Sequence, residues 1–341
     1  MTLDDKNILI TGGTGSFGKK FITKLLDDTK VKRIVCYSRD ELKQYQLLEQ
    51  LKTSNKKDID KNRIRLFIGD VRDSDRLKMA MKNIDYVVHA AALKQVPAAE
   101  YNPMECIKTN ILGAQNVIDA CIENQVEKVV ALSTDKAANP INLYGATKLA
   151  SDKLFTAANN ISGSNDLKFS VVRYGNVFGS RGSVVPLFLD YKDKGKKVYP
   201  VTDQRMTRFW ITLDQAVNFV SNTFERMQGG EIFVPKIPSV KILDVLKAID
   251  SDYKFEEIGI RPGEKMHEVM CPSDESHRVI EFEEYFAISP SIQFFSDTVD
   301  YTTSKNGEVG KKVEDNFEYD SHNNSQYLSV NEIKDYIEKY L

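Results

Sequence analysis

The chain has 341 residues, of which 41% are hydrophobic, and its formal net charge of -2 comes from 47 basic and 49 acidic residues. This is enough apolar material for one large core or for a nucleotide-binding domain with a smaller appendage. The charges are interspersed, which excludes a nucleic-acid footprint and a polybasic membrane anchor. No CxxC, HxxH or HxxxH spacing occurs, so we expect neither disulfides nor a metal site. No apolar run approaches about 18 residues, so we expect no membrane span and a cytoplasmic location.

Short β-branched runs alternate with helical patterns through the first half of the chain. This alternation predicts an α/β fold with a doubly wound parallel sheet and helices on both faces. The expected strands cover 7–11, 31–37, 64–71, 85–91, 128–134 and 168–174. After residue 175 the pattern loosens and looks built around a ligand. There we expect a strand at 231–237 and helices near 213–227, 241–250 and 329–340.

Glycines follow the first expected strand directly, in the segment from Thr11 to Gly18 (TGGTGSFG). Glycines let the backbone turn sharply and approach a pyrophosphate, whose charge then rests on the amides of the next helix. Because this segment lies at the first strand-to-helix turn of an alternating chain, it predicts a dinucleotide site. The residues expected to form it are Gly12, Thr14, Gly15, Ser16, Phe17 and Gly18.

Basic residues stand at the end of the second expected strand, where an NAD enzyme usually carries an acid for the ribose. Arg39 can fork onto a 2′-phosphate, assisted by Ser38 and Lys43, which favours NADP over NAD. Asp40 keeps the alternative open, because a small backbone shift would direct its carboxylate at the ribose. Further cofactor contacts are expected where the third and fourth strands end, at Asp70, Val71 and Ala90.

Tyr144 and Lys148 lie four residues apart in the motif YGATK, and on a helix they share one face. A nearby positive charge is expected to lower the pKa of the phenol from its usual value of about 10, so that Tyr144 exchanges a proton with a substrate hydroxyl. The motif follows closely on a strand that ends in Ser133 and Thr134. This coupling predicts a catalytic site.

The glycine loop, the strand ending in Ser-Thr and the YxxxK motif together resemble the extended short-chain dehydrogenase/reductase family over nearly the whole chain. In that family the hydroxyl orients the substrate, the tyrosine is the acid/base and the lysine binds the nicotinamide ribose. The resemblance gives these roles to Thr134, Tyr144 and Lys148. Sugar 4,6-dehydratases that retain configuration carry Thr-Asp-Glu after this strand, whereas inverting ones carry Thr-Asp-Lys, as here. Five segments look like the inverting UDP-N-acetylglucosamine dehydratases: 90–94, 134–140, 173–177, 206–210 and 261–265.

Asp135 and Lys136 are expected to do the additional chemistry of a dehydratase. An epimerase or simple reductase acts at one carbon, whereas eliminating water across carbons 5 and 6 also needs a base and an acid. We expect Lys136 to remove the carbon 5 proton, with its pKa lowered by burial and by Lys148, while Asp135 protonates the departing hydroxyl. Tyr144 takes the proton of the carbon 4 hydroxyl. A UDP-sugar 4-epimerase and a regulator that binds NADP(H) without turnover remain alternatives.

The resemblance further implies UDP-N-acetylglucosamine as substrate, with two phosphates that need local cations. Arg208 and Arg261 suit them because guanidinium groups bind phosphate bidentately. The resemblance places Asn176 at the diphosphate or sugar, Lys94 at the sugar near the nicotinamide, and Glu264 at a ribose hydroxyl. The expected substrate-binding residues are therefore Lys94, Asn176, Val177, Arg208, Arg261 and Glu264, and Lys94 also counts among the cofactor contacts.

Together these features divide the chain into three parts. Residues 1–175 are expected to form the NADP-binding Rossmann domain, to which 209–236 returns. A smaller α/β region that binds the UDP-sugar is expected over 176–208 and 237–300, followed by an exposed polar tail and a terminal helix over 301–341. The resemblance also implies a homo-oligomer that serves the synthesis of pseudaminic acid or another deoxyamino sugar for bacterial surface glycans.

Overall fold

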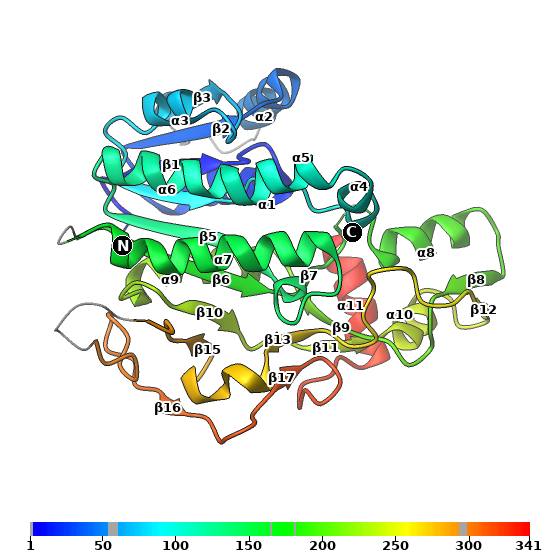
Figure 1. The fold of residues 1–341 in the computed structure, drawn as a ribbon. Helices are drawn as coiled ribbons and strands as arrows, with labels where there is room; N and C mark the ends of the chain where they lie inside the picture. The colour runs from blue at the N-terminus through cyan, green and yellow to red at the C-terminus, as the bar shows by residue number, and fades with distance from the viewer. Residues whose placement is uncertain (1–2, 54–60, 164–165, 181, 293–298) are drawn as a thin grey trace.

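A ten-stranded, mostly parallel sheet runs through the molecule in the order β16-β14-β15-β10-β6-β5-β4-β1-β2-β3 (Figure 1). The computed structural model describes residues 3–53, 61–163, 166–180, 182–292 and 299–341. From β3 to β10 all neighbours are parallel, whereas β15, β14 and β16 add an antiparallel edge. The strands are β1 (Asn7–Thr11), β2 (Arg33–Ser38), β3 (Ile64–Ile68), β4 (Tyr86–His89), β5 (Lys128–Thr134), β6 (Lys168–Tyr174), β10 (Ile232–Pro235), β14 (Val279–Glu281), β15 (Tyr285–Ile288) and β16 (Lys311–Lys312).

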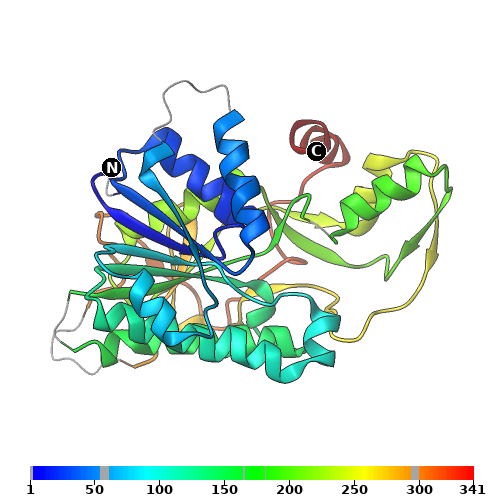
Figure 2. The ribbon, with the colours of Figure 1, turned by 90° about the horizontal axis from the view of Figure 1, so that it is seen from above.

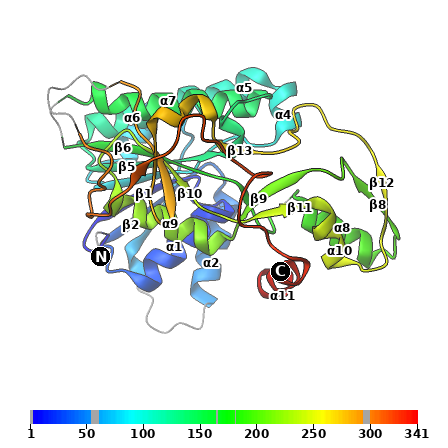
Figure 3. The ribbon, with the colours of Figure 1, turned by 90° about the horizontal axis from the view of Figure 1, so that it is seen from below.

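Helices cover both faces of this sheet, which confirms the doubly wound fold (Figures 2 and 3). One face carries α1 (Ser16–Asp28), α2 (Glu41–Thr53) and α9 (Leu213–Arg226), and the other carries α6 (Gly113–Glu123) and α7 (Leu143–Ile161). Helix α3 (Ser74–Ala80) packs against α6 on that second face. The central strands are apolar on both sides because both sides are covered. The apolar stripe of α1, for example, buries Phe21, Ile22, Leu25 and Leu26 against the sheet.

A smaller lobe lies beside the carboxyl ends of the parallel strands (Figure 1). Its three-stranded sheet has the order β11-β9-β7, and β8 pairs with β12 at its outer end. A separate apolar core, with Phe178, Phe188, Tyr199 and Trp210 among its members, holds the lobe together. Its elements are β7 (Asn176–Val177), α8 (Val184–Asp193), β8 (Val198–Val201), β9 (Thr207–Ile211), β11 (Ser239–Lys241), α10 (Ile242–Ile249), β12 (Lys254–Glu257) and α11 (Val330–Tyr340).

The chain crosses between the two parts more often than its sequence pattern suggests. Residues 209–236 do place β10 beside β6. The stretch 237–300, expected near the substrate, is divided, because β11 and α10 belong to the lobe while β14 and β15 extend the large sheet. The remaining elements are η1 (Lys61–Arg63), α4 (Val96–Tyr101), α5 (Pro103–Ile107), the π-helix η2 (Lys108–Leu112), η3 (Asp135–Ala137), β13 (Val269–Cys271), η4 (Ser273–Arg278) and β17 (Tyr319–Asp320).

Most residues of 301–318 are exposed or half-buried, as expected, but the segment is tied into the fold at its end. Strand β17 pairs antiparallel with β13, and Ser321 beside it is fully buried. Its hydroxyl shares a 2.7 Å hydrogen bond with that of Thr207. Polar composition suggested solvent, but these polar groups satisfy one another inside the protein.

Two further features concern the described residues only. No helix among them is long and apolar enough to cross a membrane. They contain no group of three or more His, Cys, Asp or Glu side chains arranged to hold a metal ion, and the four cysteines are buried and free.

Candidate active site

The glycine loop between β1 and α1 has the shape of an anion cradle. Gly12 adopts a φ of +67°, and a side chain on Gly18 would collide with the backbone of Gly13, so the loop packs closely only without side chains. Helix α1 starts after Gly15 with no side-chain cap and no acidic residue in its first turn. Its first amides are therefore free to bind an anion, and the loop fits the pyrophosphate of a dinucleotide.

The other residues of the predicted loop site lie around this cradle. Thr14 and Gly18 are buried, Phe17 is half-buried and stacks on Phe21, and Gly15 and Ser16 are exposed. A side chain on Gly12 would press on the backbone of Ala90 and Ala91, which puts the end of β4 directly against the loop.

The end of β2 presents positive charge at the rim of the cofactor site. The Arg39 side chain is 55% exposed and its Nη1 lies 3.5 Å from the Asp70 carboxylate, which Arg72 holds more closely at 2.7 Å. Ser38 is buried, and its hydroxyl accepts a hydrogen bond from Gln44. The Asp70 carboxylate thus faces two arginines, of which Arg39 is the more distant and the more exposed.

Asp40 has a local structural task. Its Oδ1 accepts a hydrogen bond from the backbone N–H of Lys43 at 3.0 Å, and its Oδ2 lies 2.8 Å from the Lys43 ammonium. These contacts hold the Asp40 carboxylate in the turn that starts α2. They also pair the Lys43 ammonium, predicted to assist in binding the cofactor, with Asp40. Val71 is buried behind this rim, where it packs in the main core.

Strand β5 and helix α7 meet at the turn that carries the proposed chemistry. Thr134 ends β5, η3 follows with Asp135 and Lys136, and Tyr144 lies in the first turn of α7. A side chain on Gly145 would collide with the carbonyl oxygen of Lys136, so only glycine lets η3 pack against α7 this closely. The structure therefore brings Lys136 and Tyr144 together, as the catalytic hypothesis requires.

Asp135 is fully buried at the centre of this turn. Its Oδ1 accepts hydrogen bonds from the Thr134 hydroxyl at 2.8 Å and from the Lys136 ammonium at 3.1 Å. Its Oδ2 has no hydrogen-bond partner among the residues that the structure describes. Burial raises the pKa of Asp135 against the opposing influence of Lys136, and nearby Glu268 raises it further. The carboxyl is therefore biased toward the protonated form that a general acid needs.

Lys136 lies between two carboxylates, and its side chain is 25% exposed. Its Nζ is 3.1 Å from Asp135 and 3.3 Å from Glu268. Burial alone lowers the pKa of Lys136, but these two carboxylates outweigh it and raise that pKa. The expectation of a lowered pKa is wrong for this state, because the sequence did not reveal the second carboxylate.

The pKa expected for Tyr144 is wrong as well. Burial raises the pKa of Tyr144 to about 12, and the largest opposing influence is the Lys136 ammonium. Lys148 is buried with its Nζ donating to the carbonyl of Leu132 at 2.7 Å. Burial lowers the pKa of Lys148, while Asp152 opposes the shift. A nearby cation does lower the pKa of Tyr144, as expected, but that cation is Lys136 and not Lys148.

Glu268 is a site residue that sequence reasoning missed. It precedes β13 and is 2% exposed, and its Oε1 contacts Lys136. Burial raises the pKa of Glu268, but Lys136 and Arg208 outweigh it and lower that pKa, so the group is a carboxylate. No motif or periodicity marks this position, and only the packing of distant segments reveals it.

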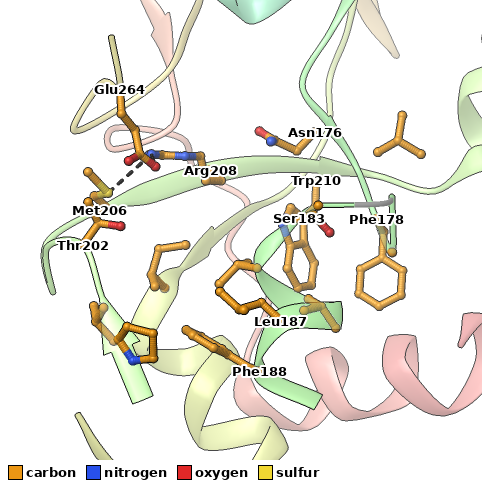
Figure 4. Close-up of a pocket in the computed structure, with 18 of the residues that line it drawn as sticks. Asn176, Phe178, Ser183, Leu187, Phe188, Thr202, Met206, Arg208, Trp210 and Glu264 are labelled. Carbon is orange, nitrogen blue, oxygen red and sulfur yellow. Dashed lines mark hydrogen bonds and ion pairs between the residues drawn. The ribbon is translucent and has the colours of Figure 1, made fainter. Parts of the chain in front are cut away.

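A pocket in the lobe collects most of the predicted substrate residues (Figure 4). Arg208 donates to the backbone carbonyls of Thr207 and Met266 at 2.7 and 3.0 Å, and its Nη2 lies 3.1 Å from Glu264. Aromatic rings line the opposite side, among them Phe178, Phe188 and Trp210. The predicted residues that line this pocket are Asn176, Val177, Arg208, Arg261 and Glu264. Lys94 does not line it and is exposed beyond the end of β4.

Three buried oxygens in this pocket have no hydrogen-bond partner among the described residues: Oδ1 of Asn176, Oγ of Ser183 and Oε2 of Glu264. Such acceptors suit the hydroxyl and N–H donors of a sugar nucleotide. Arg208 Nε also lies 3.9 Å from Glu268, so the pocket adjoins the turn that carries Lys136. The arrangement can hold an anionic sugar nucleotide with its sugar near Tyr144.

The doubly wound sheet, the glycine cradle and the Thr134, Tyr144 and Lys148 set define an enzyme of the extended short-chain dehydrogenase/reductase class. More narrowly, the chain belongs to the polysaccharide biosynthesis protein family, whose profile matches residues 8–290. It is 58% identical, over 97% of each chain, to the UDP-N-acetylglucosamine 4,6-dehydratase (inverting) of Campylobacter jejuni. It is 40% identical to the UDP-glucose 4-epimerase of Rickettsia canadensis, over 97% of this chain and 95% of that one.

Solved structures agree with this fold. Pen from Bacillus thuringiensis superposes with a TM-score of 0.85 at 40% identity, over 98% of this chain and 97% of that one. The dTDP-glucose 4,6-dehydratase DesIV from Streptomyces venezuelae, solved with NAD bound, has a TM-score of 0.63 at 21% identity over 76% of this chain and 86% of its own. At that identity DesIV supports the fold alone.

Proposed function

We propose that this protein is an inverting UDP-N-acetylglucosamine 4,6-dehydratase, which converts its substrate to a UDP-2-acetamido-2,6-dideoxy-4-keto-hexose with inverted carbon 5. The observation that carries the proposal is the placement of Asp135 and Lys136 beside Tyr144 at the end of β5. The identity of 58% to the Campylobacter dehydratase supports it.

Tyr144 and Thr134 act on the hydroxyl at carbon 4. Thr134 orients that hydroxyl, and Tyr144 accepts its proton as a phenolate. Burial disfavours the phenolate and raises the pKa of Tyr144 to about 12, whereas the nearby Lys136 ammonium stabilises the phenolate and lowers that pKa. A nicotinamide cofactor held by the glycine loop from Gly12 to Gly18 would supply a transient store for the hydride of carbon 4 until carbon 6 takes it back, so no external reductant would be consumed.

Lys136 and Asp135 then act on carbons 5 and 6. The new 4-keto group acidifies carbon 5, and elimination needs a neutral amine and a protonated carboxyl. One proton shift along the 3.1 Å hydrogen bond from Lys136 Nζ to Asp135 Oδ1 produces both at once. A dry site favours this neutral pair over the ion pair, because substrate removes the water that stabilises the charges. Lys136 removes the carbon 5 proton as Asp135 protonates the departing hydroxyl.

The alternative that the comparisons raise is a UDP-sugar 4-epimerase. It would use Tyr144 and Lys148 in the same way but leave Asp135 and Lys136 without a task. The test is incubation with UDP-N-acetylglucosamine in heavy water, followed by NMR of the sugar. A 4-keto product with a carbon 6 methyl group and deuterium at an inverted carbon 5 is expected. A product that keeps its carbon 6 hydroxyl would refute dehydration, and retained configuration at carbon 5 would refute inversion alone.

The cofactor in this proposal is NADP, held tightly by the cradle after β1. The fit of the glycine loop to a pyrophosphate, at the first strand-to-helix turn of the sheet, supports a nicotinamide dinucleotide. The preference for the 2′-phosphate rests on the exposed Arg39 and on Asp40, whose carboxylate is engaged in the turn that starts α2. Isothermal titration with NADP⁺ and NAD⁺ tests it, and tighter binding of NAD⁺ would refute it.

The cellular setting is carried over from the resemblance. It comprises a cytoplasmic location, a homo-oligomer, and a role in making pseudaminic acid or a related deoxyamino sugar. Exposed apolar side chains on α4 and α5, Tyr101 at 87% and Met104 at 56%, suit an interface between copies. Light scattering of the purified protein tests the assembly, and a monomer at micromolar concentration would contradict it.

A further inference from the structure

Glu268 touches both the proposed base and the cation of the substrate pocket. Its Oε1 lies 3.3 Å from Lys136 Nζ and 3.9 Å from Arg208 Nε. Its backbone is fixed on both sides of the peptide, because its N–H donates to the Ser321 hydroxyl at 2.9 Å and its carbonyl accepts from the Ser321 N–H at 2.8 Å. The backbone that carries this buried carboxylate is therefore anchored at the junction of two functional groups.

Neutralising Arg208 does not account for this carboxylate. Arg208 already has Glu264 at 3.1 Å and two backbone carbonyls as partners. Lys136 is in a different position, because its other carboxylate, Asp135, must carry a proton to serve as the acid. Glu268 is the other carboxylate among the described residues that contacts Lys136 Nζ, and its lowered pKa keeps it charged whether or not Asp135 has taken the Lys136 proton.

We propose that Glu268 is a positioning residue, which holds the Lys136 ammonium beside Tyr144 until the carbon 4 hydroxyl has lost its proton. This inference rests on the proposed dehydratase function. Without Glu268, the Lys136 proton would pass to Asp135 before the first step, and Tyr144 would lose the cation that stabilises its phenolate. Glu268 thus sets the order of the two proton transfers. The charged and titratable groups around Lys136 are Asp135, Glu268, Arg208, Tyr144 and Lys265.

Glu268→Gln tests this order, because it keeps the shape of the side chain and removes its charge. Loss of a negative charge this close to Lys136 lowers the pKa of Lys136, and the first step needs Lys136 as an ammonium, so the alkaline limb of the kcat–pH profile should move to lower pH by about one unit or more. KM for UDP-N-acetylglucosamine should stay within about threefold of wild type, since Arg208 keeps its other partners. A merely structural role would lower kcat at every pH without moving the limb.

Two further variants make the result specific. Glu268→Asp keeps the charge on a shorter side chain, so its limb should stay at the wild-type position while kcat falls about tenfold through misplacement of Nζ. Should Glu268→Gln fail to fold, Glu268→Asp carries the test, and wild-type kcat in it would overturn the inference. Glu264→Gln removes a carboxylate that contacts Arg208 but not Lys136, so it should raise KM and leave the limb in place.

The outcomes separate the inference from the function beneath it. Wild-type protein that forms no 4-keto-6-deoxy sugar overturns the dehydratase proposal and this inference with it. Wild-type protein that forms the product, together with an unmoved limb in Glu268→Gln, overturns the inference alone. An equal limb shift in Glu264→Gln would also overturn it, because the effect would then be a general change of charge in the cleft.

Discussion

Replacing Lys136 by methionine removes the ammonium and keeps most of the side-chain volume. The two carboxylates that held it, Asp135 and Glu268, have side chains that are 0% and 3% exposed, so neither gains water as a substitute. Removing one partner of a buried ion pair costs about 3–5 kcal/mol. We expect a loss near the lower end, about 3 kcal/mol, because Asp135 has a raised pKa and takes up a proton.

The pH dependence gives this loss a signature. A carboxyl whose pKa is raised in the folded state binds its proton there at a pH where the unfolded chain does not, so acid stabilises the folded variant. The deficit of Lys136→Met relative to wild type should therefore shrink as the pH falls and be largest above neutrality. Urea unfolding of both proteins across this range measures it, and a deficit that grows toward acid would refute the assignment of two buried carboxylates.

The same substitution should stop the second half of the reaction. Loss of a general base costs about 10²–10⁴-fold in rate, which corresponds to roughly 2.7–5.5 kcal/mol in the barrier. Deuterium at carbon 5 and the carbon 6 methyl group, followed by NMR, report this step directly. Lys153→Met is the matched control, since Lys153 lies on α7 with a side chain 50% exposed. Product formation by Lys136→Met within about threefold of wild type would refute its role as base.

Three more substitutions test the rest of the site. Gly18→Ala drives a methyl group into the backbone of Gly13, so we expect NADPH affinity to fall at least about tenfold in a fluorescence titration; unchanged affinity would contradict the cradle. Arg208→Lys loses the fork that reaches two carbonyls and Glu264, so UDP binding by calorimetry should weaken about tenfold, and equal affinity would exclude Arg208 from the diphosphate site. Burial, reinforced by Lys148, lowers the pKa of His89 to about 3, so the unfolded chain binds a proton that the folded one refuses between that pH and about 6.5. The free energy of unfolding should therefore decrease by up to about 1.4 kcal/mol for each pH unit as the pH falls through that window, as measured by urea unfolding. His89→Gln should remove this slope, whereas His277→Gln, at an exposed position, should keep it.

The parts of this protein that sequence reasoning predicts well are those encoded locally. Strands β1 and β5 begin and end at their predicted bounds, 7–11 and 128–134, because apolar patterning and the glycine loop are properties of neighbouring residues. The meeting of Thr134, Asp135, Lys136 and Tyr144 is local too, since η3 links β5 to α7 across a short turn. The close packing at Gly145 then follows from the lack of a side chain there.

The pKa values of Tyr144 and Lys136 are both raised where the sequence predicts them to be lowered, and for a common reason. Spacing places Tyr144 and Lys148 on one helix face but says nothing of where the ammonium points, and it points at the carbonyl of Leu132. Burial, which raises the pKa of Tyr144, depends on how the whole chain packs around it. Likewise, the pKa of Lys136 is raised by a carboxylate whose segment precedes β13, far along the chain.

The C-terminal polar segment shows most clearly why composition fails at this site. Ser321 reads as part of a solvated tail, yet it is fully buried and fixes the backbone of Glu268 through two hydrogen bonds. Its hydroxyl also bonds to Thr207, which neighbours Arg208 on β9. Buried polar groups of this kind are stabilised only by one another, so their burial is invisible until their partners are known. A segment that the sequence predicts to be an exposed tail therefore anchors the backbone of the carboxylate that contacts Lys136.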